Sequence, residues 1–189
     1  MIAGLVLAAG AGRRFGSAKQ LAELGGVPLL QHAVDAMLAV PALDRVVVVL
    51  GAAAEEIGAA VRFASAEPIV CPDWPEGMAA SLRCGVSELT GADWVVVTLG
   101  DMPGVTPEAI EAVIGACAAD VDAVRAEYGG RPGHPVGLSR TLLDRVGRLR
   151  GDVGARELLR HARVRAVEAR HLARPDDVDT PEQLEAIRG

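Results

Sequence analysis

Aromatic residues are scarce in this 189-residue chain: they make up 3% of it, although hydrophobic residues make up 50%. The core must therefore be built from Val, Leu, Ile and Ala, which suits closely packed helices and strands. The length fits one domain with a single sizeable core. We find no internal repeat, low-complexity tract or linker, so we expect residues 1–189 to form one domain.

Cysteines are also few. Cys71, Cys84 and Cys117 are odd in number and lack the paired spacing of metal sites, which indicates reduced thiols. No apolar run reaches the roughly 18 residues that a membrane span requires. The N-terminal apolar stretch has no basic leader, so it does not resemble a secretory signal. These absences predict a cytoplasmic protein without a membrane partner.

Basic residues are fewer than acidic residues. The chain has 19 Lys and Arg against 25 Asp and Glu, a formal net charge of −6. This balance argues against nucleic acid as a partner, because binding its backbone requires a basic surface. A local cluster of Arg13, Arg14 and Lys19 therefore indicates a small-anion site on an acidic protein.

That cluster belongs to the segment Leu7–Lys19, around which we expect the site to be organised. An apolar run over residues 2–8 enters a loop that contains Gly10, Gly12 and Gly16. Glycines let the backbone approach an anion closely, N–H groups can point inward, and the cations offset charge. The segment predicts a phosphate-binding loop, and a surface loop whose glycines only make turns is the alternative.

Apolar runs and their flanking residues predict an alternation of strands and helices. We expect strands over residues 2–8, 45–50, 69–71, 94–99, 122–126 and 164–167. We expect helices over residues 28–40, 55–61, 78–89, 140–146 and 154–161, one beginning at Thr106–Pro107, and a last one capped at residues 180–182. A tight turn is expected over residues 21–28, a loop over 72–77, and irregular backbone over the Gly- and Pro-rich residues 127–138.

This alternation predicts an α/β fold: a single-domain three-layer α/β/α sandwich with a mostly parallel, doubly wound, Rossmann-like sheet. Ligands of such sheets bind beyond the carboxyl ends of the strands. Residues 10–19 and the pair Gly100–Asp101 both follow expected strands, so both should lie at that edge.

Two general phosphate-loop patterns fit poorly. The nucleoside triphosphatase pattern fails because Gly12 and Gly16 are too close together and Ser17 stands where lysine is required. The dinucleotide pattern fails at Phe15, where it needs glycine, and the second strand is not followed by an acidic residue. Loosened variants of the dinucleotide pattern keep a nicotinamide-dependent oxidoreductase open as an alternative.

A third pattern fits better. Residues 7–16, Leu-Ala-Ala-Gly-Ala-Gly-Arg-Arg-Phe-Gly, with Lys19 beyond them, resemble the signature of the nucleotidyltransferases that include the molybdenum cofactor guanylyl- and cytidylyltransferases. Later segments also resemble this family: Gly77–Arg83, Leu99–Pro103, Gly133–Val136, Gly151–Arg156 and Asp177–Glu182. The resemblance implies the nucleotide-diphospho-sugar transferase type of α/β fold.

The resemblance also implies roles for individual residues. The nucleotide-binding set is Leu7, Ala8, Ala9, Gly10, Gly12, Arg14, Lys19, Gly77, Met78 and Ser81. Arg14, Lys19 and Asp101 would be catalytic. Because the family position is the second arginine, we expect Arg13, rather than Arg14, to face solvent. Trp74 and Trp94 are expected to be packing anchors.

The implied cofactor is Mg²⁺, which prefers one or two carboxylates and completes its shell with water and phosphate. Asp101 and Asp179 are the expected ligands, and Asp177 is the alternative to Asp179. Asp101 could instead cap the following helix, and Asp179 could be a turn residue.

The acceptor-binding residues implied by the resemblance are His134 and Asp152. For His134 the alternative is a hydrogen bond to its own backbone, and for Asp152 it is an N-cap on the helix expected at Gly154.

The reaction that the resemblance implies is transfer of CMP from CTP to the phosphate of a molybdopterin-type cofactor, with release of pyrophosphate. Ala9 and Gly151–Arg156 favour CTP, while GTP or another phosphorylated acceptor remains the alternative. The resemblance further implies a molybdoenzyme or its chaperone as a partner that receives the finished cofactor.

Overall fold

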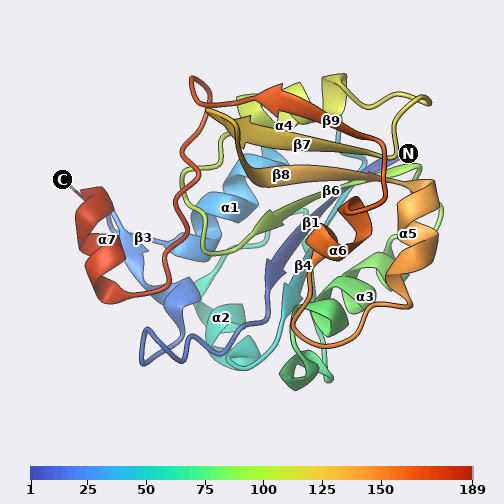
Figure 1. Cartoon of the computed structure of the whole chain (residues 1–189). Helices are drawn as coiled ribbons and strands as arrows, with labels where there is room; N and C mark the ends of the chain where they lie inside the picture. Colours follow the sequence, from blue (N-terminus) through green and yellow to red (C-terminus); the bar gives the residue numbers. More distant parts are fainter. Residues whose placement is uncertain (189) are drawn as a thin grey trace.

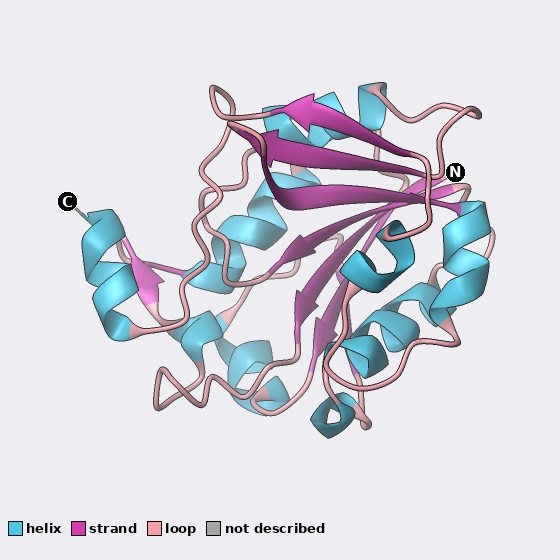
Figure 2. Cartoon of the chain, in the orientation of Figure 1, coloured by secondary structure: helices cyan, strands magenta, loops and turns pink. Residues whose placement is uncertain are grey.

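The computed structural model describes residues 1–188 and contains one seven-stranded sheet (Figure 2). Its strands are β1 (Ile2–Ala8), β4 (Arg45–Leu50), β5 (Glu67–Val70), β6 (Trp94–Leu99), β7 (Ala123–Tyr128), β8 (Arg131–Ser139) and β9 (Val164–Glu168). Their order is β5-β4-β1-β6-β8-β7-β9. All neighbours pair in parallel except at β8, which runs antiparallel to both β6 and β7. The mostly parallel sheet is confirmed.

Helices cover both faces of the sheet (Figure 1). One face carries α1 (Leu29–Leu38), α2 (Ala54–Ala60) and α4 (Pro107–Gly115). The other carries α3 (Met78–Glu88), α5 (Arg140–Val146) and α6 (Ala155–Leu159). The three-layer α/β/α sandwich is therefore confirmed. Within residues 1–188, no helix combines the length and apolarity needed to cross a membrane.

The central strands are apolar throughout because both faces of the sheet are buried. In β1, Val6 packs toward the face of α1, whereas Leu5 packs toward the face of α3. Val48 and Val47 of β4 alternate in the same way, as the period of two in a strand requires. Continuous burial thus explains why these strands carry no polar stripe.

Strand β8 corrects the expectation of irregular backbone over residues 127–138. Its Val136 and Leu138 are buried, and its register with β7 shifts between the pairs Arg125–Val136 and Glu127–Pro132. The shift leaves Gly133, His134 and Pro135 in a bulge, which tolerates proline because the ladder is already interrupted there. The Gly- and Pro-rich composition therefore marks a bulged strand, not the absence of one.

The region expected to be a tight turn contains more structure. It holds the 3-10 turn η1 (Lys19–Leu21) and a short hairpin of β2 (Glu23–Leu24) and β3 (Val27–Pro28). The expected loop at residues 72–77 contains a second 3-10 turn, η2 (Trp74–Glu76).

The last helix, α7 (Pro181–Arg188), lies beside this hairpin (Figure 1). Leu29, Val178 and Leu184 form a small separate core there. The N–H of Val178 donates to the carbonyl of Asp101 at 2.9 Å, which brings the segment before α7 to the end of β6.

Candidate active site

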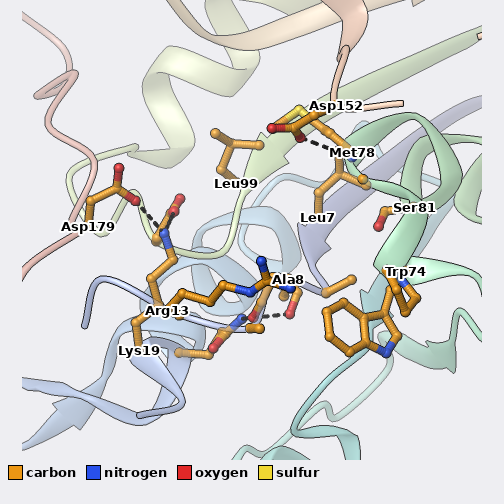
Figure 3. A pocket seen from close by; sticks show the side chains of 18 of the residues that line it. Leu7, Ala8, Arg13, Lys19, Trp74, Met78, Ser81, Leu99, Asp152 and Asp179 are labelled. Atoms are coloured by element: carbon orange, nitrogen blue, oxygen red, sulfur yellow. Dashed lines mark hydrogen bonds and ion pairs between the residues drawn. The ribbon is translucent and has the colours of Figure 1, made fainter. Parts of the chain in front are cut away.

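A cavity of about 620 Å³ opens at the carboxyl ends of β1 and β6 (Figure 3). Its lining includes every residue that the sequence assigns to nucleotide or metal, and it includes Asp152. Lys19 and Asp179 lie at one end, and Trp74 and Ser81 lie at the other. The structure therefore brings together segments that are up to 172 residues apart, from Leu7 to Asp179.

The glycine loop forms one wall. After β1 the chain turns at Gly12, which has a φ of +60°, and the Gly12 carbonyl accepts from the N–H groups of Phe15 and Gly16 at 2.9 and 3.0 Å. The backbone N–H groups of residues 9–14 find no acceptor among the described residues, and all six residues line the cavity. Consecutive N–H groups of this kind form an anion-binding concavity.

A lysine and two carboxylates form the end wall. Lys19 Nζ donates to Asp101 Oδ2 and, at 2.7 Å, to Asp179 Oδ1. Arg14 lies outside them, 77% exposed, and its Nη1 donates to Asp179 Oδ2 at 2.9 Å. Together, these contacts of Lys19 and Arg14 join the loop, the end of β6 and the segment before α7.

Burial and pairing change the acidity of these groups. Burial raises the pKa of Asp101 even though the Lys19 ammonium opposes this effect. The hydrogen bond from Lys19 lowers the pKa of Asp179. Burial disfavours the Lys19 ammonium, but the two carboxylates outweigh burial and raise the pKa of Lys19. The lysine is therefore held in its charged form.

The donor set fits a magnesium ion. Asp101 Oδ1 is buried and has no hydrogen-bond partner, so a carboxylate oxygen is available beside the cavity. No group of three His, Cys, Asp or Glu side chains is placed to hold a metal anywhere in residues 1–188. Mg²⁺ prefers one or two carboxylates and takes its other ligands from water and phosphate, which is what Asp101 and Asp179 would provide. Asp177 does not line the cavity.

The N-terminus of α3 forms the opposite wall. Asp152 Oδ1 accepts from the N–H of Met78 at 3.3 Å, and the Gly151 carbonyl accepts from the N–H of Ala79 at 3.2 Å. Asp152 therefore binds the first turn of α3. It does not cap α6, whose N-cap residue, Gly154, receives no side-chain hydrogen bond.

His134 is the one expected site residue that does not line the cavity. It lies in the bulge of β8, and its carbonyl accepts from the Tyr128 hydroxyl at 2.7 Å. Burial lowers the pKa of His134 to about 4, so the imidazole is neutral near pH 7.

Several lining residues were not expected. Arg13 is exposed, as expected, and it also lines the cavity and extends toward it (Figure 3). Trp74 also lines it, and its indole packs over Gly51, where a Cβ would lie 2.8 Å from Trp74 Cγ. Its position three residues before Gly77 is the sequence signal that could have found it. Gln20 has no comparable signal.

The fold and this site together define a nucleotidyltransferase of the α/β class. Residues 4–169 match the MobA-like NTP transferase domain, and the chain belongs to this family. It is 34% identical to the purine catabolism protein PucB of Bacillus subtilis, over 98% of this chain and 95% of that protein. It is 31% identical to a protein of Paenarthrobacter nicotinovorans named nicotine blue oxidoreductase, over 97% and 94% of the two chains.

Solved structures share this fold. The structure of Rv0371c of Mycobacterium tuberculosis in complex with manganese has a TM-score of 0.83 and 30% identity, with 98% of this chain and 97% of that chain covered. Molybdopterin-guanine dinucleotide biosynthesis protein A of Archaeoglobus fulgidus has a TM-score of 0.73 and 23% identity, over 100% and 97% of the chains, and shows the shared fold.

Proposed function

We propose that this nucleotidyltransferase transfers CMP from CTP to the phosphate of a molybdopterin-type acceptor and releases pyrophosphate, with Mg²⁺ as its metal. The MobA-like family and a structural neighbour named for molybdopterin-guanine dinucleotide biosynthesis support the acceptor class. The manganese complex of Rv0371c supports a divalent metal.

One observation carries the proposal: the unpartnered N–H groups of residues 9–14 line the same cavity as Lys19, Asp101 and Asp179. A triphosphate presents several anionic oxygens in a row. The N–H groups would bind them along the loop, while the Lys19 ammonium offsets their charge at one end.

The transfer requires little proton chemistry. An oxygen of the acceptor phosphate attacks the α-phosphorus of CTP, the bond from this phosphorus to the bridging oxygen breaks, and pyrophosphate leaves with the electron pair. The acceptor phosphate is already ionised near neutral pH, so no strong general base is needed. Magnesium, held by Asp101 and Asp179, would neutralise charge on the triphosphate oxygens. Alignment and charge neutralisation supply the catalysis.

The far end of the cavity would hold the base and the acceptor. Ser81 lies in the first turns of α3 and Trp74 lies in η2 just before this helix, where the base and ribose are expected. Asp152 lies on the segment that contacts this helix. CTP is preferred over GTP in this proposal on account of Ala9 and residues 151–156.

A second candidate rests on a different observation. The 31% identical relative is named an oxidoreductase, and it is similar over 94% of its length. A nicotinamide-dependent reaction with the pyrophosphate of a dinucleotide on the glycine loop is therefore the competing function.

A pyrophosphate-release screen tests the proposal. The purified protein is incubated with Mg²⁺ and each of CTP, GTP, ATP and UTP, with molybdopterin or with an isoprenoid or sugar phosphate as acceptor. We expect release with CTP and molybdopterin above every other pair. We also expect CTP with Mg²⁺ to raise the melting temperature more than NADH does.

The alternatives predict different outcomes. Pyrophosphate release with GTP would show that GTP, not CTP, is the substrate, and release with another acceptor would exclude molybdopterin. In either case the protein would still be a nucleotidyltransferase. A thermal shift with NADH and none with any triphosphate would reject the transferase proposal in favour of the oxidoreductase.

A further inference from the structure

Gln20 is a buried polar residue next to the glycine loop, with 2% of its surface exposed. Its Nε2 donates two hydrogen bonds, to the carbonyl of Ala8 and to the carbonyl of Gly10, each at 2.8 Å. An amide nitrogen carries two hydrogens, so its donor capacity is fully used. Its Oε1 is buried and has no partner among the described residues.

These two bonds determine the orientation of two peptide planes. The carbonyl of Ala8 shares its peptide unit with the N–H of Ala9, and the carbonyl of Gly10 shares its unit with the N–H of Ala11. In a trans peptide the C=O and N–H point in opposite directions. Both carbonyls point toward Gln20, so the N–H groups of Ala9 and Ala11 point away from it. Both N–H groups belong to the row without acceptors that lines the cavity.

Few other bonds hold the loop at this point. The Gly12 turn fixes its far end, and no heavy atom lies within 4 Å of where a Gly10 side chain would begin. Before that turn, the Ala9 carbonyl accepts from the N–H of Ala52 at 3.3 Å, and the Gly10 carbonyl accepts from Gln20 Nε2. Gln20 follows Lys19 in η1, so one short turn places both the loop restraint and the ammonium.

We propose that Gln20 is a positioning residue that orients the loop N–H groups of Ala9 and Ala11 for a triphosphate. This role rests on the proposed function, in that it assigns the loop to a polyphosphate. Glutamine suits the position chemically, since it supplies two N–H donors from one uncharged atom. A lysine would add charge, and methionine has no donor. The unpartnered Oε1 indicates a residue that is not optimised for stability alone.

The test measures binding of inorganic tripolyphosphate with Mg²⁺ by calorimetry, because this probe depends on neither the base nor the acceptor. We expect Gln20→Met to bind it on the order of tenfold more weakly than the unaltered protein, since the two N–H groups lose their orientation. Its melting temperature should also fall, because the carbonyls of Ala8 and Gly10 lose their donor, and the control described next separates this effect from binding. In steady-state assays KM for the triphosphate should rise, while KM for the acceptor stays unchanged.

Gln31 offers a matched control. It is also buried, with 5% exposed, and its Nε2 also donates two bonds, to Arg62 O at 2.9 Å and Asp35 Oδ1 at 2.7 Å. It does not line the cavity. Gln31→Met should lower the melting temperature and leave the affinity for tripolyphosphate unchanged.

Gln20→Glu supplies a second, pH-dependent readout of the same donor role. Burial raises the pKa of the introduced carboxyl group, and only its protonated form can donate to a carbonyl. The ratio of its tripolyphosphate affinity to that of the unaltered protein should therefore be higher at pH 5.5 than at pH 8. This variant also keeps the proposal testable if Gln20→Met does not fold.

The outcomes separate the two proposals. Affinity of Gln20→Met equal to that of the unaltered protein, or an equal loss in Gln31→Met, would overturn the positioning role and leave the transferase proposal intact. The positioning role would also be overturned if the affinity of Gln20→Glu relative to the unaltered protein were the same at pH 5.5 and pH 8. Absence of tripolyphosphate and CTP binding by the unaltered protein would overturn both.

Discussion

At the scale of single residues, Lys19 links two carboxylates that come from distant parts of the chain. Its Nζ contacts Asp101 at the end of β6 and Asp179 before α7. The lysine and Asp101 are 13% and 16% exposed, so each reduces the cost of burying the other. The same ammonium lies beside the loop that is proposed to bind phosphate. Its removal should therefore affect both stability and binding.

The substitution Lys19→Met tests both effects. We expect weaker CTP binding and a loss of about 1–3 kcal/mol in the free energy of unfolding at pH 8, because Asp101 loses its counterion. Without Lys19, burial keeps the pKa of Asp101 above its unfolded value, so the loss should shrink as the pH falls and the carboxylate is protonated. Urea denaturation at pH 5 and pH 8 measures this. If the loss in the free energy of unfolding were the same at both pH values, Lys19 would not act as the counterion of Asp101.

The acidic residues near the cavity allow a matched comparison. Asp179 lines the cavity and contacts Lys19, whereas Asp177, two residues before it, does not line it. We expect Asp101→Asn and Asp179→Asn each to reduce pyrophosphate release by about 10²-fold or more, and Asp177→Asn to leave it near normal. Circular dichroism checks that the folds are intact. If only Asp177→Asn loses pyrophosphate release, Asp177 and not Asp179 is the metal ligand.

At the scale of elements, two segments outside the sheet place the charged groups. The turn η1 places Lys19, and the segment before α7 places Asp179. That segment is held by one buried side chain, Val178, and by its backbone bond to the Asp101 carbonyl. The position of Asp179 thus depends on apolar packing as well as on its hydrogen bonds from Lys19 and Arg14.

Shortening Val178 should therefore affect both stability and chemistry. We expect Val178→Ala to lower the free energy of unfolding by about 1–2 kcal/mol, and also to reduce pyrophosphate release because Asp179 is less well placed. Val146→Ala, at a residue of α5 that is 1% exposed and away from the cavity, is the control. It should lose stability and retain its rate. Equal rates in the two variants would show that the segment does not position Asp179.

At the scale of the whole molecule, the β8 bulge makes His134 a source of acid sensitivity. Its pKa is about 4 in the folded protein, against about 6.5 in an unfolded chain. The unfolded state therefore takes up the proton first as the pH falls, and stability decreases between about pH 6.5 and pH 4. This destabilisation concerns the fold and not the cavity, since His134 does not line it.

The substitution His134→Asn tests this effect. Between pH 6.5 and pH 4, the free energy of unfolding of the variant should fall by roughly 2 kcal/mol less than that of the unaltered protein. Urea denaturation across this pH range measures the difference. Its affinity for CTP should not change. If CTP affinity falls while the acid sensitivity stays, His134 belongs to the binding site after all.

Much of the fold could be predicted because central parallel strands are apolar without interruption. The bounds of β1, β4, β6 and α5 agree with those expected from residues 2–8, 45–50, 94–99 and 140–146. The N-terminus of α4 also agrees, since the Thr106 side chain accepts from the N–H of Ala109 at 3.4 Å. Strand β8 could not be predicted, because it forms by pairing with β6 and β7 on either side, which local composition does not report.

The sequence by itself determined the α/β class and the edge of the sheet where the site lies, and its resemblance to a known family gave most of the residues that meet there. It did so because burial on both faces and glycine spacing are local properties of the chain. Only the tertiary structure decided how these residues are connected. Gln20 holds the loop carbonyls, Lys19 joins Asp101 to Asp179, and His134 lies apart in a bulge. Each of these facts depends on contacts between segments distant in sequence, and such contacts follow from packing, not from local pattern.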